Sequence, residues 1–435
     1  MNILNHTIPF REDCSHLLDI FKDEPNLFFL DSSLSHSKEG EFSYLGFSPF
    51  KVVKTKSFDH LRKTLKPYLG LKSKLTFPGG AIGCIGYDGE MWFGLYQGLI
   101  CVDHNRKLLT ITSTGRPFKS PIRQRREALK RKEYILNKII HYRCAQKSIE
   151  RSSIKLLLKS NTSQREYQSA VKKALQHIHR GDIYQINLSH RYEVGIKQWQ
   201  KYVHPVEIYK QLRALSPSNF SAYMNDGQRV ILSSSPERFL KLTGNIVQVK
   251  PMKGTRPRGK TSREDQSNKI ELVQSDKEKA ELLMVTDLER NDLGRVCSYG
   301  SVNVKAMRTI EEYKTVFQAT STVEGRLHEK FDQFDLLRAT FPSGSVTGCP
   351  KIEAMKIIRK IEKAKRGVYT GALGYISFTG NMDFNVLIRT ILLEKDKISF
   401  YVGGGIVADS NPQKEYEETL VKSQAMVAAL RKIFR

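Results

Sequence analysis

The pattern of hydrophobic and polar positions divides the chain into three stretches. Residues 1–115 contain short, glycine-rich segments typical of strands, such as FPGGAIGCIGYD at positions 77–88. Residues 116–160 open with two prolines and then place apolar residues at positions 129, 135, 136, 139 and 140, which predicts an amphipathic helix with a basic outer face. Helical and strand-like patterns alternate over 161–435. We therefore expect an N-terminal subdomain, a basic helical linker and a main domain.

Two of the helical patterns carry a pair of glutamates on one face. In DKEKAELLMVTDLERNDLG, Glu278 and Glu281 are three positions apart, and Glu415 and Glu418 repeat this spacing in KEYEETLVKSQAMVAAL. Two such helices could hold Mg²⁺, which prefers one or two carboxylates together with water and an anionic substrate. Each pair taken alone is also typical of a solvated helix face, so both interpretations stay open.

The segment FPSGSVTGCPKIEAMKIIRKIEK is a Gly/Ser/Thr-rich turn that leads into a helix, with Pro350 in the first turn. The apolar residues of this helix, Ile352, Met355, Ile358 and Ile361, fall at helical spacing. Free N–H groups at such a helix start attract anions, and a capped core helix fits the pattern equally well.

Residues 367–393 predict two strands across a Gly-Asn turn. Arg389 would lie within the second strand pattern, NVLIRTILL, where a charge among apolar residues needs either a structural partner or a substrate carboxylate. Gly403 to Gly405 either let the backbone approach a ligand closely or mark a bulge.

Residues 254–261 read GTRPRGKT, which matches the nucleotide-binding pattern G-x-x-x-x-G-K-[ST]. That pattern must run directly into a helix, whereas SREDQSNKI after it is polar and weakly helical. Pro257 and two arginines within the loop also argue against it. We expect no nucleotide site here.

Charge is the unusual feature of the composition. The 435 residues carry 71 Lys and Arg against 45 Asp and Glu, a net charge of +26, while 40% hydrophobic residues exclude general disorder. Fourteen Lys and Arg against three Asp and Glu lie between residues 116 and 159. Such a charge indicates an anionic partner, but no nucleic-acid recognition motif accompanies the run, so a solvated basic helix is favoured.

Targeting and redox features are few. The six cysteines form no C-x-x-C pair and suggest neither a zinc site nor a disulfide framework. The N-terminus lacks the pattern of a signal peptide, and no apolar run approaches the length of a membrane span. We expect a soluble, cytoplasmic protein without a membrane partner.

Several long segments, in order, resemble the chorismate-utilising enzymes, and among them aminodeoxychorismate synthase component I. The resemblance rests on GDIYQINLSHR, SSSPERFL, PMKGTRPRG, AELLMVTDLERNDLGRV, FPSGSVTGCPK, GALGYISFTGNMD and GGGIVADSNPQKEYEET, with FLDSS, YLGFSPF and GGAIGCIGYD in the first third. It implies an α/β fold, a single large unit of two packed β-sheets with outer helices, whose catalytic domain spans 161–435. The nucleotide-like KGTRPRG is then a family motif.

The resemblance also implies the reaction. Chorismate and ammonia give 4-amino-4-deoxychorismate, the precursor of para-aminobenzoate in folate biosynthesis, with Mg²⁺ as cofactor and ammonia supplied by a separate glutamine amidotransferase subunit. The alternative within the family is anthranilate synthase component I of tryptophan biosynthesis, which eliminates pyruvate after amination. No nucleic-acid partner is implied.

Site residues follow by matching motifs. Glu281 and Glu418 resemble the direct Mg²⁺ ligands, and Glu278 and Glu415 their outer or water-mediated partners. The residues that match substrate-binding positions are Tyr369, Arg389, the Gly405 backbone, Ser345, Lys422 and Gln185.

Lys253 and Gln185 distinguish among the reactions that members of the family catalyse. Anthranilate-forming relatives usually carry Ala where this chain has Lys253, which in aminodeoxychorismate synthases is the nucleophile that adds to the ring. Glu237 matches the general acid that protonates the departing hydroxyl, a role suited to a carboxyl with a raised pKa. Gln185 replaces the lysine base of water-using relatives, so ammonia is the expected nucleophile.

Three departures from the family pattern are visible. Gln318 stands where many relatives have His, which removes any imidazole role there, and Cys349 replaces a usual Ala. FLDSS and SNFSAYM differ from the tryptophan-binding pattern of feedback-inhibited relatives, so we expect no tight feedback by tryptophan.

Overall fold

The computed structural model describes residues 3–34, 39–142, 156–313 and 316–434. Its helices are α1 (His16–Phe21), α2 (Phe58–Leu65), α3 (Pro121–His141), α4 (Gln164–His179), α5 (Pro205–Leu215), α6 (Ser262–Gln274), α7 (Asp276–Gly294), α8 (Gln333–Thr340), α9 (Lys351–Ile361) and α10 (Pro412–Ile433), with short 3₁₀ turns η1 (Lys66–Tyr68), η2 (Trp199–Lys201) and η3 (Gly344–Val346).

The strands of the first half of the chain are β1 (Leu4–Pro9), β2 (Phe28–Asp31), β3 (Phe42–Gly46), β4 (Lys51–Thr55), β5 (Gly80–Ile85), β6 (Met91–Tyr96), β7 (Gly98–Asp103), β8 (Leu108–Ser113), β9 (Lys159–Ser160) and β10 (Gln185–Gly195). Those of the second half are β11 (Phe220–Asn225), β12 (Val230–Ser235), β13 (Arg238–Thr243), β14 (Ile246–Val249), β15 (Met252–Pro257), β16 (Asn303–Glu312), β17 (Val316–Arg326), β18 (Gly348–Cys349), β19 (Ala372–Ser377), β20 (Met382–Val386), β21 (Thr390–Glu394) and β22 (Lys397–Ile406).

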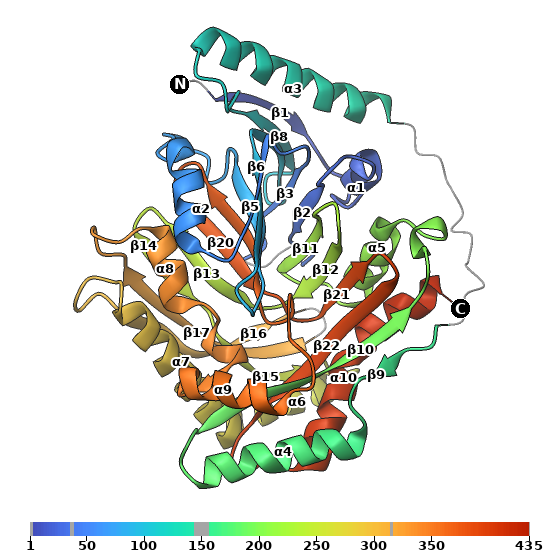
Figure 1. Cartoon of the computed structure of the whole chain (residues 1–435), viewed down its shortest axis with the longest axis vertical. Helices are drawn as coiled ribbons and strands as arrows, with labels where there is room; N and C mark the ends of the chain where they lie inside the picture. Colours follow the sequence, from blue (N-terminus) through green and yellow to red (C-terminus); the bar gives the residue numbers. More distant parts are fainter. Residues whose placement is uncertain (1–2, 35–38, 143–155, 314–315, 435) are drawn as a thin grey trace.

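The described strands form two large antiparallel sheets, with helices outside them (Figure 1). Sheet A has twelve strands in the order β1-β8-β7-β3-β2-β11-β12-β21-β22-β10-β18, with β9 beside β10. Sheet B has ten strands in the order β15-β17-β14-β13-β20-β19-β5-β6-β4, with β16 beside β17. This arrangement confirms the predicted α/β fold of two packed sheets.

Both sheets combine strands from before and after the basic segment. In sheet A, β2 pairs with β11, and in sheet B, β5 pairs with β19. The stretches 1–115 and 161–435, distinguished by their sequence patterns, therefore share each sheet and its hydrogen bonds.

An apolar layer joins the inner faces of the sheets. Phe28 and Tyr44 of sheet A lie in one buried cluster with Tyr96 and Tyr375 of sheet B, and the Tyr44 and Tyr375 rings are 5.8 Å apart. The outer face of sheet A is covered by α1, α3, α5 and α10, whose side chains enter another cluster. The outer face of sheet B is covered by α2 and α8.

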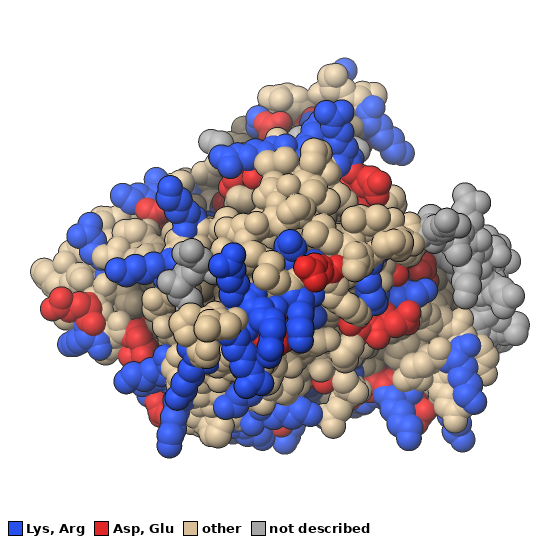
Figure 2. Space-filling view, turned by 90° about the horizontal axis from the view of Figure 1, so that it is seen from above, with Lys and Arg blue, Asp and Glu red and all other residues tan. Residues whose placement is uncertain are grey.

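The basic segment forms the predicted amphipathic helix α3, which packs on the N-terminal end of sheet A through Ile135. Figure 2 views this end of the molecule, where Lys and Arg side chains gather on the surface. Two cations of α3 instead hold the helix in place: Arg131 lies over the Phe47 ring and donates to its carbonyl at 2.7 Å, and Lys138 pairs with Glu24. Burial lowers the pKa of Arg131 to about 10. The remainder of the basic run, 143–155, lies outside the described residues.

The structure differs from the sequence patterns in three places. SREDQSNKI forms helix α6, because Thr261 caps its start by accepting the Glu264 N–H. The buried positions of α9 are Ala354, Ile357 and Ile358, whereas Ile352 is exposed.

The third difference concerns residues 367–393, which form three strands rather than two. After β20 in sheet B, the chain crosses to sheet A, where β21 begins at Thr390. Arg389 lies at this crossing with a φ of 50°, outside any strand. A continuous apolar run conceals such a crossing, because both halves are buried strands.

Among the described helices, none is long and apolar enough to cross a membrane. The five described cysteines are free, and Cys144 lies outside the described residues.

Candidate active site

Lys253, Gln185 and the backbone of Gly405 converge where the two sheets approach each other. Lys253 comes from β15 of sheet B, whereas Gln185 and Gly405 come from β10 and β22 of sheet A. A Cβ atom on Gly405 would lie 2.6 Å from Gln185 Nε2 and 3.4 Å from Lys253 Nζ. The glycine is therefore needed because a side chain would collide with the Gln185 amide.

Four glutamates and two lysines surround this point. Glu281 Oε2 lies 4.0 Å from Lys253 Nζ. Lys277 Nζ lies 3.9 Å from Glu281 and 3.6 Å from Glu415, so it bridges α7 and α10. Burial and the nearby charges of Glu415 and Glu418 raise the pKa of Glu281, while Lys253 and Lys277 oppose the shift.

The α10 carboxylates face the glycine-rich strand β22. A Cβ atom on Gly404 would lie 3.4 Å from Glu415 Oε2 and 3.7 Å from Glu418 Oε1. Lys422 pairs with Glu418 at 2.6 Å and donates to the Gly403 carbonyl at 3.0 Å. Although burial acts to raise it, Lys422 holds the pKa of Glu418 below its usual value.

The carboxylates are chemically suited to Mg²⁺. Glu415 is buried, and its Oε1 accepts a hydrogen bond from Ser410 at 2.7 Å. Glu278 pairs with Arg256 at 2.9 Å through one oxygen, while its other oxygen is buried without a hydrogen-bond partner. Within the described residues, no group of three or more His, Cys, Asp or Glu side chains stands in a metal-binding arrangement. Lys277 lies 3.9 Å from Glu281 and 3.6 Å from Glu415, so its ammonium is the cation that these two carboxylates face in this structure. Their oxygens are of the hard type that Mg²⁺ prefers.

Glu237 is a buried acid beside Lys253. Burial raises the pKa of Glu237 to about 7, although hydrogen bonding from Ser345, the positive charge of Lys253 and the Met252 N–H lower it. A carboxyl that titrates near neutral pH can donate a proton where an ordinary glutamate would be ionised. Ser345 lies on η3, the turn before α9.

Arg389 is a half-buried cation at the crossing between the two sheets. In the described part of the chain, no ion pair or hydrogen bond involves its guanidinium, and burial lowers its pKa. Tyr369 is buried and stacks on Tyr401 with ring centroids 5.1 Å apart. A half-buried cation without a counterion is costly, so an anionic substrate is a natural partner for Arg389.

Arg366 braces the segment that carries Tyr369. Its guanidinium pairs with Glu362 at 2.7 Å and donates to the carbonyls of Val346 at 2.8 Å and Asn187 at 2.6 Å. Sequence reasoning missed this residue and also Lys277. The four-residue spacing of Lys277 and Glu281 signals a helical ion pair, but nothing local reveals its contact with α10.

The segment that resembles a nucleotide-binding loop has its N–H groups occupied. Gly259 N–H donates to Asp265 at 2.8 Å and Lys260 N–H to Glu264 at 2.8 Å, while Arg258 pairs with Asp265 at 2.7 Å. Carboxylates of α6 thus take the place that a phosphate would need.

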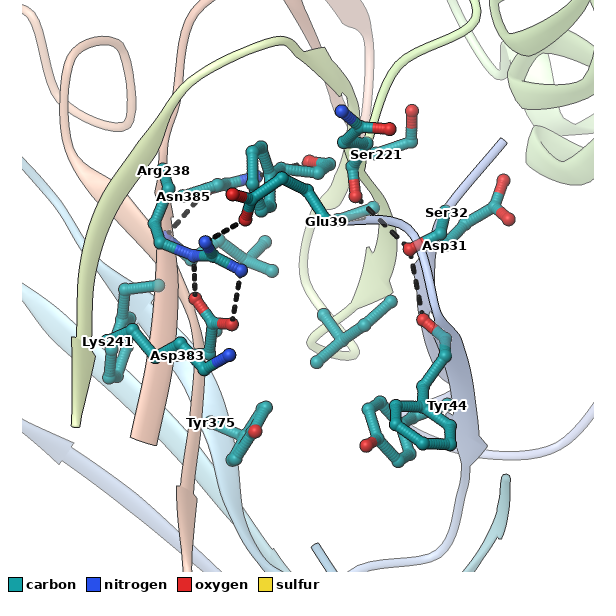
Figure 3. A pocket seen from close by; sticks show the side chains of 18 of the residues that line it. Asp31, Ser32, Glu39, Tyr44, Ser221, Arg238, Lys241, Tyr375, Asp383 and Asn385 are labelled. Carbon is teal, nitrogen blue, oxygen red and sulfur yellow. Dashed lines mark hydrogen bonds and ion pairs between the residues drawn. The ribbon is translucent and has the colours of Figure 1, made fainter. Parts of the chain in front are cut away.

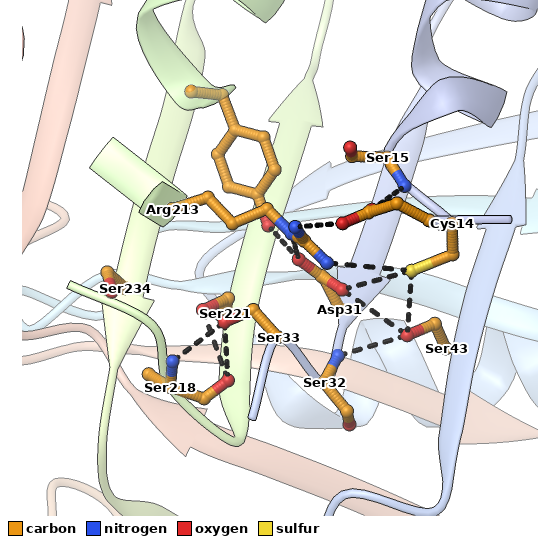
Figure 4. Close-up of polar contacts among 12 residues, drawn as sticks. Cys14, Ser15, Asp31, Ser32, Ser33, Ser43, Arg213, Ser218, Ser221 and Ser234 are labelled. Carbon is orange, nitrogen blue, oxygen red and sulfur yellow. Dashed lines mark hydrogen bonds and ion pairs between the residues drawn. The ribbon is translucent and has the colours of Figure 1, made fainter. Parts of the chain in front are cut away.

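A separate cavity of about 220 Å³ lies between the sheets (Figure 3). FLDSS and SNFSAYM both contribute to its walls, through residues such as Asp31 and Ser221. Arg238 in this cavity is paired with Asp383 at 3.0 Å and with Glu39. Figure 4 shows the neighbouring network, in which Asp31 accepts from Arg213 at 2.6 Å.

Two departures from the family pattern are buried or half-buried in strands. Gln318 lies buried on β17 opposite Thr255, and Cys349 lies on β18 opposite Gln185. Burial raises the pKa of the Cys349 thiol.

Comparison with known proteins gives a consistent result. A family model described as chorismate binding enzyme matches residues 38–428. The chain is 34% identical to aminodeoxychorismate synthase component 1 of Escherichia coli, with 82% of this chain and 78% of that protein covered. It is 33% identical to anthranilate synthase component 1 of Acetivibrio thermocellus, with 99% and 95% covered. Other curated relatives are matched over only 54% to 56% of their own length.

A solved structure is also similar. The crystal structure of anthranilate synthase component I from Streptococcus pneumoniae superposes with a TM-score of 0.76 at 29% identity, covering 90% of this chain and 93% of that one.

Proposed function

Since this chain belongs to the family of chorismate-binding enzymes, we propose that it is component I of an aminodeoxychorismate synthase, which replaces the C4 hydroxyl of chorismate with an amino group. The observation that carries the proposal is the position of Lys253, which lies beside Gln185, Gly405 and the acid Glu237. The other activity named among the relatives is that of anthranilate synthase.

Chorismate is a dianion, and the site offers separate groups for its two carboxylates. Arg389 and Tyr369 bind the pyruvyl carboxylate, together with the Gly405 backbone. Glu281 and Glu418 would hold Mg²⁺, with Glu278 and Glu415 outside them, and the ion would supply positive charge opposite the ring carboxylate. Lys422 orients Glu418 through their 2.6 Å contact.

Lys253 acts as the nucleophile. Its amine adds at C2 as the C4 hydroxyl departs with a proton from Glu237, so that water leaves. Ammonia then attacks C4 and the Lys253 amine is displaced from C2. Two substitutions thereby replace one difficult displacement.

Gln185 favours ammonia over water as the second nucleophile. Its amide cannot remove a proton at neutral pH, and water needs a base to attack whereas ammonia does not. A separate amidotransferase subunit supplies the ammonia in this proposal.

Products distinguish the two amination reactions. The purified chain is incubated with chorismate, Mg²⁺ and ammonium at alkaline pH, and the products are separated by mass and fluorescence. Aminodeoxychorismate retains the enolpyruvyl group, whereas anthranilate has lost it as pyruvate. Anthranilate as the main product would overturn the proposal.

Lys253→Ala tests the covalent step. We expect this variant to lose most aminodeoxychorismate formation with ammonia, while Lys260→Ala, in the same segment, retains it. The Lys260 ammonium has no described contact, which makes it a matched control. Full activity of Lys253→Ala would show that the lysine is not the nucleophile.

A further inference from the structure

A line of hydroxyl groups connects Glu237 to a second buried glutamate, Glu289 on α7. Ser345 hydrogen-bonds the Glu237 carboxyl, and its Oγ lies 3.0 Å from Ser343 Oγ. Ser343 Oγ in turn lies 3.1 Å from Glu289 Oε1. The Gly344 N–H donates to the same Glu289 oxygen at 3.0 Å, so both ends of the line are fixed to the turn η3.

A complete line of hydrogen bonds requires one more hydrogen than the two serine hydroxyls supply. Its three links each join two oxygens, and each hydrogen bond between oxygens needs one hydrogen. The two serine hydroxyls supply two, so the third comes from a carboxyl. A complete line therefore contains one protonated glutamate, and either end can carry the proton.

We propose that Glu289 is a proton reservoir for Glu237, and that the two carboxyls share one proton through Ser345 and Ser343. This inference rests on the proposed function, in which Glu237 protonates the departing hydroxyl. Glu289 does not touch substrate and acts through the two serines.

The proton transfer balances at every oxygen. Glu237 gives its proton to the C4 hydroxyl, which leaves as water. That proton is the shared one: where it rests on Glu289, Ser343 takes it, Ser345 takes the hydrogen of Ser343, and Glu237 takes that of Ser345 as it protonates the hydroxyl. Both carboxyls are then ionised. Ammonia releases one proton as it becomes the bound amine, and that proton returns the line to its starting state.

The surroundings of both carboxyls favour one retained proton. Burial raises the pKa of Glu289 to about 7, with Asp292 adding to the shift and Lys351, Ser343 and the Gly344 N–H opposing it. Glu289 Oε2 is buried and has no hydrogen-bond partner, which disfavours the anion. The groups that face Glu237 are Ser345, Lys253 and the Met252 N–H. Two carboxyls that compete for one proton titrate as a pair.

Glu289→Gln tests the inference while conserving volume. The amide N–H supplies the third hydrogen permanently, so Glu237 can ionise without breaking a link. We expect the alkaline limb of the kcat/KM profile for chorismate, measured at constant free ammonia, to move down by about 1 pH unit. Ser343→Ala interrupts the line and frees Ser345 to donate to the Glu237 anion, so it should move the limb in the same direction.

Thr347→Val is the matched control. It removes a buried hydroxyl beside the same turn, and the Thr347 hydroxyl donates to the carbonyls of Ser343 and Gly344 rather than to a carboxyl. The alkaline limb of its kcat/KM profile should stay at the wild-type pH. If the limb also stays in Glu289→Gln and Ser343→Ala while the rate falls, Glu289 only supports the turn and the inference is wrong.

An infrared titration separates this inference from the proposed function. Carboxylic-acid absorption is compared between wild type and Glu289→Gln, with Glu237→Gln/Glu289→Gln as reference and no substrate present. We expect the last proton of the wild-type pair to be retained to higher pH than the Glu237 proton of Glu289→Gln. Equal titration would overturn proton sharing, whereas absence of amination by the wild type would overturn the proposed function alone.

Discussion

Arg389→Met should abolish much of the affinity for chorismate without destabilising the fold. The guanidinium has no ion pair or hydrogen bond with the described residues, and burial lowers its pKa. Its removal therefore leaves no protein charge unpaired, and we expect the free energy of unfolding to change by less than about 1 kcal/mol. A hydrogen bond to a charged group contributes about 1.5–3 kcal/mol, which corresponds to a loss of about 10- to 150-fold in chorismate affinity.

Arg366→Met is the matched comparison. Arg366 is more deeply buried than Arg389, with 2% of its surface exposed, and it pairs with Glu362 at 2.7 Å. The same substitution there leaves the buried Glu362 carboxylate without its cation. The expected cost is about 3–5 kcal/mol of stability. Calorimetric titration with chorismate and urea unfolding of both variants check the contrast. An Arg389→Met protein that binds chorismate normally, or that unfolds as easily as Arg366→Met, would refute the assignment.

Three other results are expected. Glu418→Gln should raise the Mg²⁺ concentration for half-maximal activity by about 10- to 100-fold, while Glu417→Gln, an exposed neighbour bonded to Gln413, leaves it unchanged. Glu289 has a folded-state pKa of about 7 against an ordinary 4.5, so it costs stability progressively as pH rises from about 4.5 to 7. Urea unfolding at pH 5 and pH 8 should therefore show Glu289→Gln gaining about 1–3 kcal/mol over wild type at the higher pH only. Tryptophan, added in increasing concentration at several chorismate concentrations up to saturation, should not inhibit amination. The cation of the cavity, Arg238, is already paired with two carboxylates and is not free to bind the tryptophan carboxylate. Clear inhibition would contradict this reasoning.

Local sequence signals predicted the elements of the site better than their contacts. The i, i+3 spacing placed Glu278 with Glu281 and Glu415 with Glu418 on single helix faces, because that spacing depends only on helix geometry. The contact of Lys277 with Glu415 could not be predicted, since 138 positions separate the two residues. Glu289 was missed for a similar reason: its partners lie on a turn more than fifty positions later.

Periodicity also does not show where the chain crosses from one sheet to the other, and so cannot place a polar residue at such a crossing. Arg389 looked like a charge within one strand, but it lies between β20 and β21, which belong to different sheets. A residue at such a crossing lies outside the strands and has no cross-strand neighbours that could pair with its side chain. This placement, rather than the apolar run around it, leaves its guanidinium without a protein partner.

The net charge of +26 therefore says little about how the anion is recognised. Near the site, Lys277 and Lys422 already face protein carboxylates, and in α3 Lys138 is paired with Glu24. A paired cation contributes little new attraction, because binding a substrate carboxylate would require it to give up its partner. Arg389 has no such partner among the residues that the structure describes. In the proposed function, chorismate is recognised by the Arg389 guanidinium and by the Mg²⁺ that the carboxylates would hold. Substitutions that change the surface charge should therefore alter the rate of encounter with chorismate but not the affinity.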